Sequence, residues 1–409
     1  MIKLVVVTIF IFSMLLPLPI TESSSTYAEM GEQCYLEKDY ETSVKCFDKA
    51  LELDPDNTCS LEYLGKYSME NRNLDMAEIY FGRLIELEPE NKCALKSLGE
   101  IHLSQEEYDK ALYYYNKLLE IDNSVGKTWF YKGICLKMLG NYDESVEAFD
   151  KSTGDYETLF LTWNDLGYCY YQNGEYDKAI GCFDKALTLD GNLKYSLNGK
   201  GLCCEKKEQY TMAVECFDKA VIQDECYYDA IYNKGISCYK SKKYSCAISC
   251  FEKALDLNNS NPYCYFYKAD SLNRLGEYEK AVLNYKKAIE LDSKNPIFWS
   301  GLGLSYNYLN EYNSSIQSYE KAVELNPEDD ISWSNLGYLQ YKNKNYNESI
   351  SYFEKSLDLN SNNKYAWNGL GNSYLLLKNY EKALMCYDKA IEIDPLYNEP
   401  KISKSSISK

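Results

Sequence analysis

Small and aromatic residues recur along this chain with a period of 34 residues. Aligned in blocks of 34 from Ser24 to Tyr397, ten blocks have Gly at the eighth position and the other has Ala269. The twentieth position is always Ala or Ser, and the twenty-fourth is always Phe or Tyr. All five tryptophans fall at the fourth position. A fixed period of this length predicts a repeat solenoid, in which each block packs on its neighbours.

Each block is predicted to form two antiparallel helices. In the last block, Leu370 and Tyr374 lie on one helical stripe, the pattern breaks near Lys378, and Tyr387 and Ile391 lie on a second stripe. Each helix has about 14 residues, which corresponds to roughly 20 Å. Prolines in the junctions, as in Asn326-Pro327, are typical of the turn before the next pair of helices.

The conserved spacing of small and large residues predicts how the two helices pack. Helices approach closely where one offers Gly, Ala or Ser and the other a bulky ring. In the ninth block, we therefore expect Gly303 to receive the ring of Tyr319, and a larger residue at Gly303 to overpack the pair.

The ninth block carries six residues of a recognisable pattern, namely Trp299, Leu302, Gly303, Tyr306, Ala322 and Pro327. This pattern resembles the tetratricopeptide repeat. The resemblance implies an all-α fold, a right-handed α-solenoid superhelix of eleven helix-turn-helix repeats. The repeats are 24–57, 58–91, 92–125, 126–159, 160–193, 194–227, 228–261, 262–295, 296–329, 330–363 and 364–397.

Two departures from the repeat pattern have structural consequences. In the fourth repeat, Gly154 and Glu157 stand where a helix end and a proline are expected, so we expect this junction to bend or fray. At the seventh position, where the family usually has Leu, four repeats have a lysine whose stem can pack while its ammonium reaches water. These lysines are Lys132, Lys200, Lys234 and Lys268.

The chain is acidic, with a net charge of −18 and a sequence pI of about 4.7. This charge opposes binding to phosphate backbones and to anionic membrane surfaces. We therefore expect no nucleic-acid partner. Much of the acidity falls on predicted solvent-facing positions of the second helices, where it favours solubility.

Residues 1–23 differ from the repeats. An apolar stretch from Leu4 to Leu16 follows Lys3, and Pro17, Pro19 and polar residues come next. This layout predicts a signal peptide or an N-terminal membrane anchor, with the repeats exported outside the cytoplasm. The cleavage pattern is poor, which keeps the anchor open. The alternative is a cytoplasmic protein.

The sixteen cysteines follow the repeat phase, which favours free, buried thiols used as small packing residues. Cysteines that share a position in adjacent repeats should lie on helices about 10 Å apart, too far for an easy disulfide. No Cys-x-x-Cys occurs, and Cys246 with Cys250 is an isolated i,i+4 pair without histidine partners. We predict no metal site.

Catalysis is not expected. The only histidine, His102, occupies a position where the repeat places a packed aromatic ring. The chain has no Gly-rich phosphate loop, nucleophile elbow or zinc-protease motif, and no long segment outside the repeats in which to build a cleft. We predict a non-enzymatic protein without cofactors.

The resemblance implies a binding surface, because first helices of the family line a concave groove and present positions 2, 5, 9, 12 and 13 to ligands. Several of these positions are aromatic or aliphatic here. The predicted groove residues are Tyr168, Tyr171, Ile236, Tyr239, Leu304, Tyr308, Tyr338 and Tyr341. Tyrosine offers a broad apolar face and one hydroxyl, which suits protein binding. The alternative is that these rings pack along neighbouring repeats.

Two specialised grooves of the family are not matched. The carboxylate clamp that binds chaperones requires Lys and Asn at positions 5 and 9, but Lys96 is followed by Glu100. The asparagine ladder of O-linked sugar transferases requires Asn at position 6 throughout, and only Asn233 and Asn335 provide it.

The polar tail, residues 398–409, looks too short for the helix that usually covers the last repeat. We expect the final helix, including Leu384 and Ile391, to stay partly exposed, which would allow end-to-end self-association through the uncapped last repeat.

The sequence therefore predicts a non-catalytic scaffold that binds a peptide or protein in an aromatic concave groove. One alternative is a surface-displayed structural or adhesive spacer, and another is a regulatory subunit of an envelope enzyme complex. The residues do not identify the partner or the process it serves.

Overall fold

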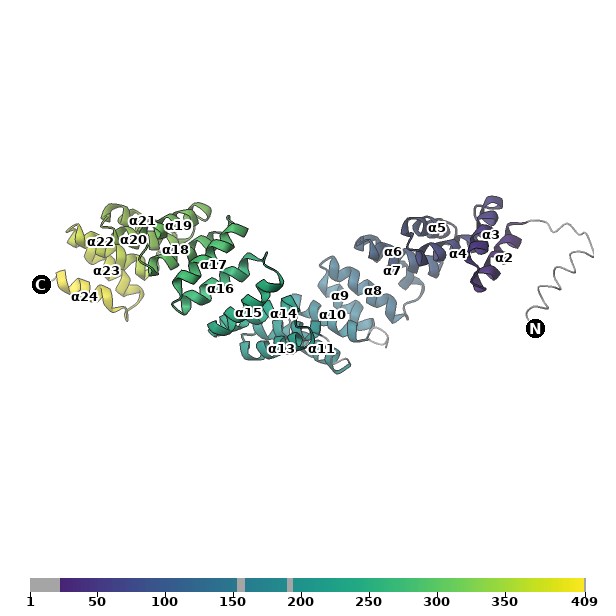
Figure 1. Ribbon diagram of the computed structural model, residues 1–409, viewed down its shortest axis with the longest axis horizontal. Coiled ribbons are helices and arrows are strands. Elements are labelled where there is room, and N and C mark those ends of the chain that lie inside the picture. The colour runs from purple at the N-terminus through teal and green to yellow at the C-terminus, as the bar shows by residue number, and fades with distance from the viewer. Residues whose placement is uncertain (1–22, 153–158, 190–193, 408–409) are drawn as a thin grey trace, which may run out of the picture. The chain divides into compact units, whose positions relative to one another are not determined.

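The computed structural model describes residues 23–152, 159–189 and 194–407, and every regular element in these ranges is an α-helix (Figure 1). The helices fall into two compact units, with repeats one to five in an N-terminal unit and repeats six to eleven in a C-terminal unit. The predicted all-α fold of paired helices is confirmed. Residues 1–22 of the predicted leader (1–23) and the junction near Gly154 lie outside the described residues.

In the N-terminal unit, successive helices alternate as first and second helix of a repeat. They are α2 (Ser24–Leu36), α3 (Tyr40–Leu53), α4 (Thr58–Glu70), α5 (Leu74–Leu87), α6 (Lys92–Ser104), α7 (Tyr108–Ile121), α8 (Gly126–Met138), α9 (Tyr142–Ser152), α10 (Leu159–Gln172) and α11 (Tyr176–Leu189).

The C-terminal unit continues the same alternation through six repeats and ends with one additional helix. Its helices are α12 (Lys194–Lys206), α13 (Tyr210–Gln223), α14 (Tyr228–Lys240), α15 (Tyr244–Leu257), α16 (Pro262–Arg274), α17 (Tyr278–Leu291), α18 (Pro296–Tyr308), α19 (Tyr312–Leu325), α20 (Asp330–Lys342), α21 (Tyr346–Leu359), α22 (Lys364–Leu376), α23 (Tyr380–Ile393) and α24 (Asn398–Ile407).

Each first helix ends in a tight turn whose fifteenth repeat position is left-handed. Gly140, Gly174 and Gly276 have φ between 78° and 81° there, and eight repeats place a non-glycine residue at φ between 59° and 66°. In the ninth repeat, the Asn310 N–H donates to the Asn307 carbonyl and the Glu311 N–H to the Tyr306 carbonyl. These bonds satisfy carbonyls at the helix end and compensate for the left-handed residue.

The glycine at the eighth position lies directly under the ring at the twenty-fourth. A Cβ added to Gly303 would lie 2.9 Å from the ring of Tyr319, and one added to Gly235 would lie 2.8 Å from the ring of Phe251. The predicted pairing of Gly303 with Tyr319 is confirmed. Serine at the twentieth position adds a polar contact, since Ser315 Oγ donates to the Gly303 carbonyl at 2.7 Å.

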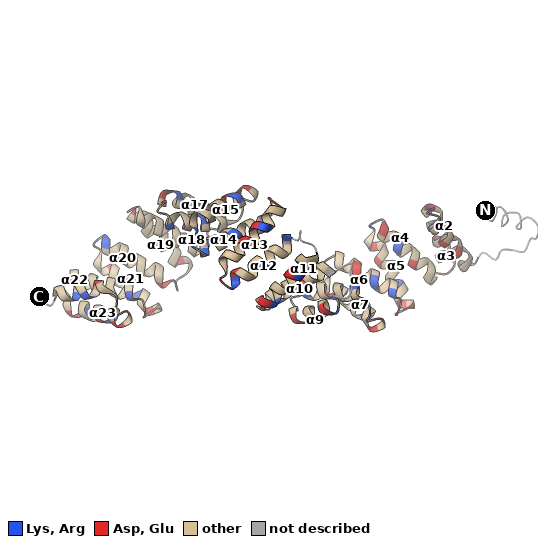
Figure 2. Ribbon diagram, turned by 90° about the horizontal axis from the view of Figure 1, so that it is seen from below, with Lys and Arg blue, Asp and Glu red and all other residues tan. Residues whose placement is uncertain are grey.

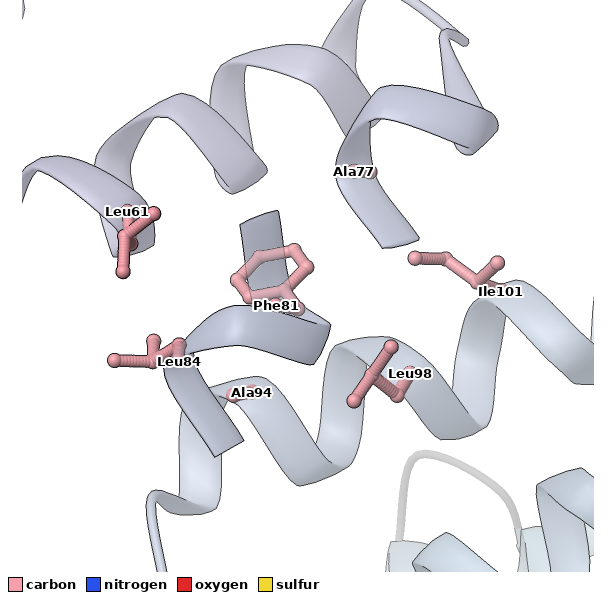
Figure 3. Packing of buried hydrophobic residues seen from close by; sticks show 7 residues of the cluster. All are labelled: Leu61, Ala77, Phe81, Leu84, Ala94, Leu98 and Ile101. Atoms are coloured by element: carbon pink, nitrogen blue, oxygen red, sulfur yellow. The ribbon is translucent and has the colours of Figure 1, made fainter. Parts of the chain in front are cut away.

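These contacts repeat between neighbouring pairs of helices and build a distributed core. In Figure 3, Phe81 of α5 lies between Leu61 of α4 and Leu98 of α6. Each of these three side chains is at most 4% exposed. Because a second helix packs on the next first helix in this way, each repeat buries the apolar face of its neighbour.

The tryptophans at the fourth position anchor the junctions between repeats. The indole N–H of Trp299 donates to the carbonyl of Ser293 at 2.9 Å, and that of Trp367 to the carbonyl of Ser361 at 2.8 Å. The Lys355 ammonium lies 4.3 Å from the ring centre of Trp333, in cation–π range.

The lysines at the seventh position pack as expected. Lys234 and Lys268 have largely buried side chains, and their ammonium groups reach carboxylates on the preceding second helix. Lys234 Nζ lies 2.5 Å from Asp218, and Lys268 Nζ lies 2.9 Å from Glu252.

The tail corrects the prediction that no helix covers the last repeat. Residues expected to be too few and too polar for a covering helix form α24, which packs against α23 and α22. Pro400 is buried, and Lys404 forms an ion pair with Asp388 of α23. A ten-residue helix suffices because it adds to an existing surface and does not have to fold alone. Leu384 and Ile391 remain partly exposed, as predicted.

Candidate functional site

The predicted groove residues lie on first helices but are divided between the two units. Tyr168 and Tyr171 lie on α10 of the N-terminal unit, and the other six lie on α14, α18 and α20 of the C-terminal unit. The C-terminal unit is therefore the part of the chain in which several of them can share one surface.

Tyr168 and Tyr171 are half-buried by neighbouring rings. The ring of Tyr168 meets Phe183 edge-on, with centroids 5.2 Å apart, and the ring of Tyr171 lies 5.8 Å from that of Tyr176 across the turn. Aromatic contacts at these distances stabilise the pair of helices. Both contacts lie within the fifth repeat, so they are not the packing along neighbouring repeats that the alternative describes.

The prediction that Ile236 lines the groove is corrected by its burial. Its side chain is 8% exposed and belongs to a core cluster that includes Phe251 of α15 and Cys264 of α16. Ile236 therefore contributes to stability and offers little surface to a ligand.

Tyr239 is held by the next repeat. Its hydroxyl donates to Asp270 of α16, and its ring lies 5.3 Å from that of Tyr267. Burial, followed by the interaction with Asp270, raises the pKa of Tyr239 above its ordinary range. The ring remains half-buried, so its free edge is a limited binding surface.

The most exposed predicted residues are Tyr308, at 50%, and Tyr338, at 42%. The ring of Tyr308 stacks on Tyr278 of α17 with centroids 4.6 Å apart, which fixes its orientation while leaving one face open. Leu304 and Tyr341 are half-buried. These four residues place apolar surface on α18 and α20.

A hollow of about 740 Å³ lies against the first helices of the last two repeats, and the four residues above are not among its lining residues. It is lined by α20, by the junction before α22, by the start of α22 and by the end of α23. The lining residues are Asp330, Ile331, Ser334, Asn335, Asn360, Asn362, Asn363, Lys364, Tyr365, Ile393 and Asp394. Positions 2 and 5 of the repeat face this hollow, as the resemblance implied in general terms.

The polar groups of the hollow hold one another in place. Asn360 Nδ2 donates to Asp330 Oδ2 at 3.0 Å, and Lys364 Nζ lies 2.6 Å from Asp394 Oδ2. Ile331 and Tyr365 are 64% and 63% exposed at its edge. Sequence reasoning did not choose these two residues, although both occupy the second position of a repeat.

A smaller cavity of about 220 Å³ lies in the N-terminal unit. Its lining residues are Lys92, Lys96, Tyr115, Leu118, Asp122, Val125, Lys127, Thr128 and Tyr131. The hydroxyl of Tyr115 is buried and has no hydrogen-bond partner within the described residues. Three lysines and one aspartate line it, and Lys92 pairs with Asp122 at 3.0 Å.

Eleven of the sixteen cysteines are buried, which agrees with their predicted role as small packing residues. The structure adds a contact that spacing along one helix did not indicate. Cys238 of α14 joins Cys246 and Cys250 of α15, and the three Sγ atoms lie within 4.8 Å of one another. The only signal in the sequence was that Cys238 and Cys250 occupy positions 11 and 23, which face each other across the repeat.

His102 is a packed side chain. It is 2% exposed, its Nδ1 lies 2.8 Å from Glu107 Oε2, and its ring stacks on Tyr114. This environment agrees with the predicted structural role.

Acidic and basic residues are interspersed over the helices of both units (Figure 2). Many form short-range pairs, such as Lys321 with Glu324 at 2.8 Å. Among the helices of the described residues, none is both long enough and apolar enough to cross a membrane.

Family models of the tetratricopeptide repeat match most of the chain. Their matches cover residues 24–57, 160–193, 195–221, 228–261, 269–307, 303–344, 331–363 and 365–397. A model described as anaphase-promoting complex, cyclosome, subunit 3, matches residues 70–152. No curated protein matches the chain.

Several solved structures are similar to this chain. The C-terminal part of a repeat-containing protein from Cytophaga hutchinsonii is 21% identical, with a TM-score of 0.51 over 59% of this chain and 99% of that one. The Cut9–Hcn1 hetero-tetramer structure matches at 13% identity and a TM-score of 0.46, over 94% and 96% of the two chains. The structure of YrrB is described as having an unusual peptide-binding site. It matches at 23% identity and a TM-score of 0.41, over 47% of this chain and 99% of that one. With its period, its helix pairs and its family matches, this chain belongs to the tetratricopeptide repeat family.

Proposed function

We propose that the protein is a non-catalytic scaffold that binds a peptide or protein on the first-helix side of its C-terminal unit. The proposal rests on two observations, namely exposed aromatic side chains on α18, α20 and α22 and a large hollow lined by α20, α22 and the end of α23. In the tetratricopeptide family this side of the helices receives ligands.

The chemistry of this surface suits an extended peptide. Tyr308, Tyr338 and Tyr365 offer ring faces that can bury apolar side chains of a ligand. Asn335 and Asn362 line the hollow with amide groups, which can donate to and accept from a peptide backbone. Lys364 and Asp330 fix the polar geometry of the hollow before a ligand arrives.

The proposal is tested with a random peptide display library and the full chain as bait. Selected peptides are then measured against a variant with Tyr308→Ala, Tyr338→Ala and Tyr365→Ala. We expect this variant to lose binding at least tenfold, because tyrosine is enriched among the few interface residues whose truncation costs about 2 kcal/mol or more, and one such residue suffices.

The matched control changes exposed apolar residues on second helices. Leu283 of α17 and Met385 of α23 are 64% and 63% exposed, and their change to alanine should leave binding intact. Unchanged helical circular dichroism is required of both variants. Equal peptide binding by both would reject the proposed surface and favour the structural or adhesive spacer.

A regulatory subunit of an enzyme complex would use the same surface and differ only in its partner. Partner capture from extracts of the producing cells, compared between the two variants, distinguishes an enzyme from another protein. We further propose export or envelope anchoring, on the sequence of residues 1–23 alone, and fractionation of those cells tests it.

A further inference from the structure

Cys238, Cys246 and Cys250 form a cluster of three thiols in the seventh repeat. Cys238 projects from α14, and the other two lie one turn apart on α15. All three sulfurs lie within 4.8 Å of one another, and the Sγ atoms of Cys238 and Cys246 are 2.7 Å apart. We propose that this cluster is a three-sulfur site for a soft, thiophilic d10 cation.

The dimensions of the cluster fit such an ion. An ion about 2.3 Å from three sulfurs in one plane holds them about 4 Å from one another. This separation falls inside the 4.8 Å limit of the cluster. To reach a separation of about 4 Å from Cys238, the Cys246 sulfur must move outward by about 1 Å. Cys246 is the half-buried member of the three.

The chemistry of the site selects the class of ion. Thiolates are soft ligands and prefer ions such as Cu(I) over Mg²⁺ or Ca²⁺. Among the described residues, the cluster contains neither a histidine nor a carboxylate, so it offers sulfur alone. Three sulfurs without a fourth protein ligand suit an ion that accepts three-coordination better than Zn²⁺, which is usually tetrahedral.

A lysine near the cluster can compensate the negative charge of the thiolates, and one cysteine is open enough for an ion to enter. Lys234, at the seventh position of the same repeat, interacts electrostatically with Cys246 and Cys250, so its ammonium opposes the charge of bound thiolates. Cys238 is 0% exposed and Cys250 is 7% exposed. Cys246 is more open, and an ion can enter beside it.

The sixth repeat has two of the three cysteine positions and serves as a comparison for the cluster of the seventh. Cys204 and Cys216 occupy the same eleventh and twenty-third positions and interact with each other. The nineteenth position, which is Cys246 in the seventh repeat, is Met212 in the sixth. Exchanging these two residues should therefore move the site from one repeat to the other.

The test uses Cd²⁺ as the probe and the full chain, reduced and desalted without oxygen. We expect one Cd²⁺ per chain to survive desalting and to give a thiolate-to-metal charge-transfer absorption. Cys238→Ser, Cys246→Met and Cys250→Ser should each lose that equivalent, whereas Cys216→Ser keeps it. Met212→Cys should gain a second equivalent.

Circular dichroism must show unchanged helix content in each variant. The proposal is overturned if the reduced chain retains no Cd²⁺, or if Cys246→Met retains as much as the parent. A Cys238–Cys246 disulfide in protein purified without reductant, together with no Cd²⁺ uptake after reduction, would also overturn it and assign the pair to redox chemistry.

Discussion

Gly303 and Tyr319 are in such close contact that a Cβ on the glycine would lie 2.9 Å from the tyrosine ring. The ring is 1% exposed and is enclosed by the helices around it, so it cannot move aside freely. We expect Gly303→Leu to lower the free energy of unfolding by about 1–3 kcal/mol through overpacking. Denaturant unfolding followed by circular dichroism measures the change.

Gly82 is the matched control for this prediction. It lies inside α5, and a Cβ added there would have nothing within 4 Å. Gly82→Ala should therefore stabilise the protein by about 0.5–1 kcal/mol, because alanine loses less backbone entropy in a helix. Similar effects at Gly303 and Gly82 would show that helix propensity, and not the ring, determines the eighth position.

Gly276 tests the turn inside the repeat. Its φ of 81° is left-handed, and a Cβ there would have no atom within 4 Å. A substitution at Gly276 therefore changes only the strain of the backbone. Gly276→Ala should cost about 1 kcal/mol, whereas Gly276→Asn should cost less, because asparagine tolerates this conformation. Asn310 occupies the same position in the ninth repeat with φ 61°. Thermal melts of the two variants should rank in that order.

The repeat period made the fold and its main packing contact predictable. A residue that must be small and another that must be aromatic, 16 positions apart in every repeat, identified the contact between Gly303 and Tyr319 before any coordinates. The family resemblance likewise assigned the predicted groove residues to first helices, because it fixes which helix each position belongs to.

Features that depend on neighbouring repeats were not predictable from one block. Ile236 is buried in a cluster that includes Cys264 of α16, and the Tyr239 hydroxyl donates to Asp270 of that same helix. The thiol cluster was missed because Cys238 reaches Cys246 across the turn, a contact that i,i+4 spacing along one helix does not include. Helix α24 was missed because its stability comes from α23, and its own sequence is polar.

Lys92 and Asp122 predict how stability depends on pH. Hydrogen bonds from Ser124 and then Lys92 lower the pKa of Asp122 to about 2, and Lys92 Nζ lies 3.0 Å from Asp122 Oδ2. Because the folded pKa lies below the unfolded value of about 3.9, this contribution is fully present above pH 4 and is lost as the pH falls toward 2. Melting temperatures measured from pH 5 to pH 2 should decline.

Other repeats place the same pair 30 residues apart, and Lys194 and Lys364 lower the pKa values of Asp224 and Asp394. Lys92→Met should therefore flatten the decline only in part. A steeper decline in this variant than in the parent would contradict the assignment. High salt should weaken the effect in the parent, because these carboxylates are partly exposed to solvent.

The last helix, α24, predicts the behaviour of a shortened chain. Asn368 Nδ2 donates to Tyr397 Oη at 3.1 Å and to Glu399 Oε2 at 3.2 Å, and these bonds fix the start of α24 against α22. Removing residues 398–409 would uncover the apolar side of the last repeat, because Pro400 and its neighbours would no longer cover it. We expect a lower melting temperature and a concentration-dependent increase in mass by light scattering, since an uncovered repeat end can pack on a second copy.

The full chain at the same concentrations is the control. If the shortened chain melts like the parent and scatters as a monomer at every concentration, α24 neither stabilises the last repeat nor limits its association.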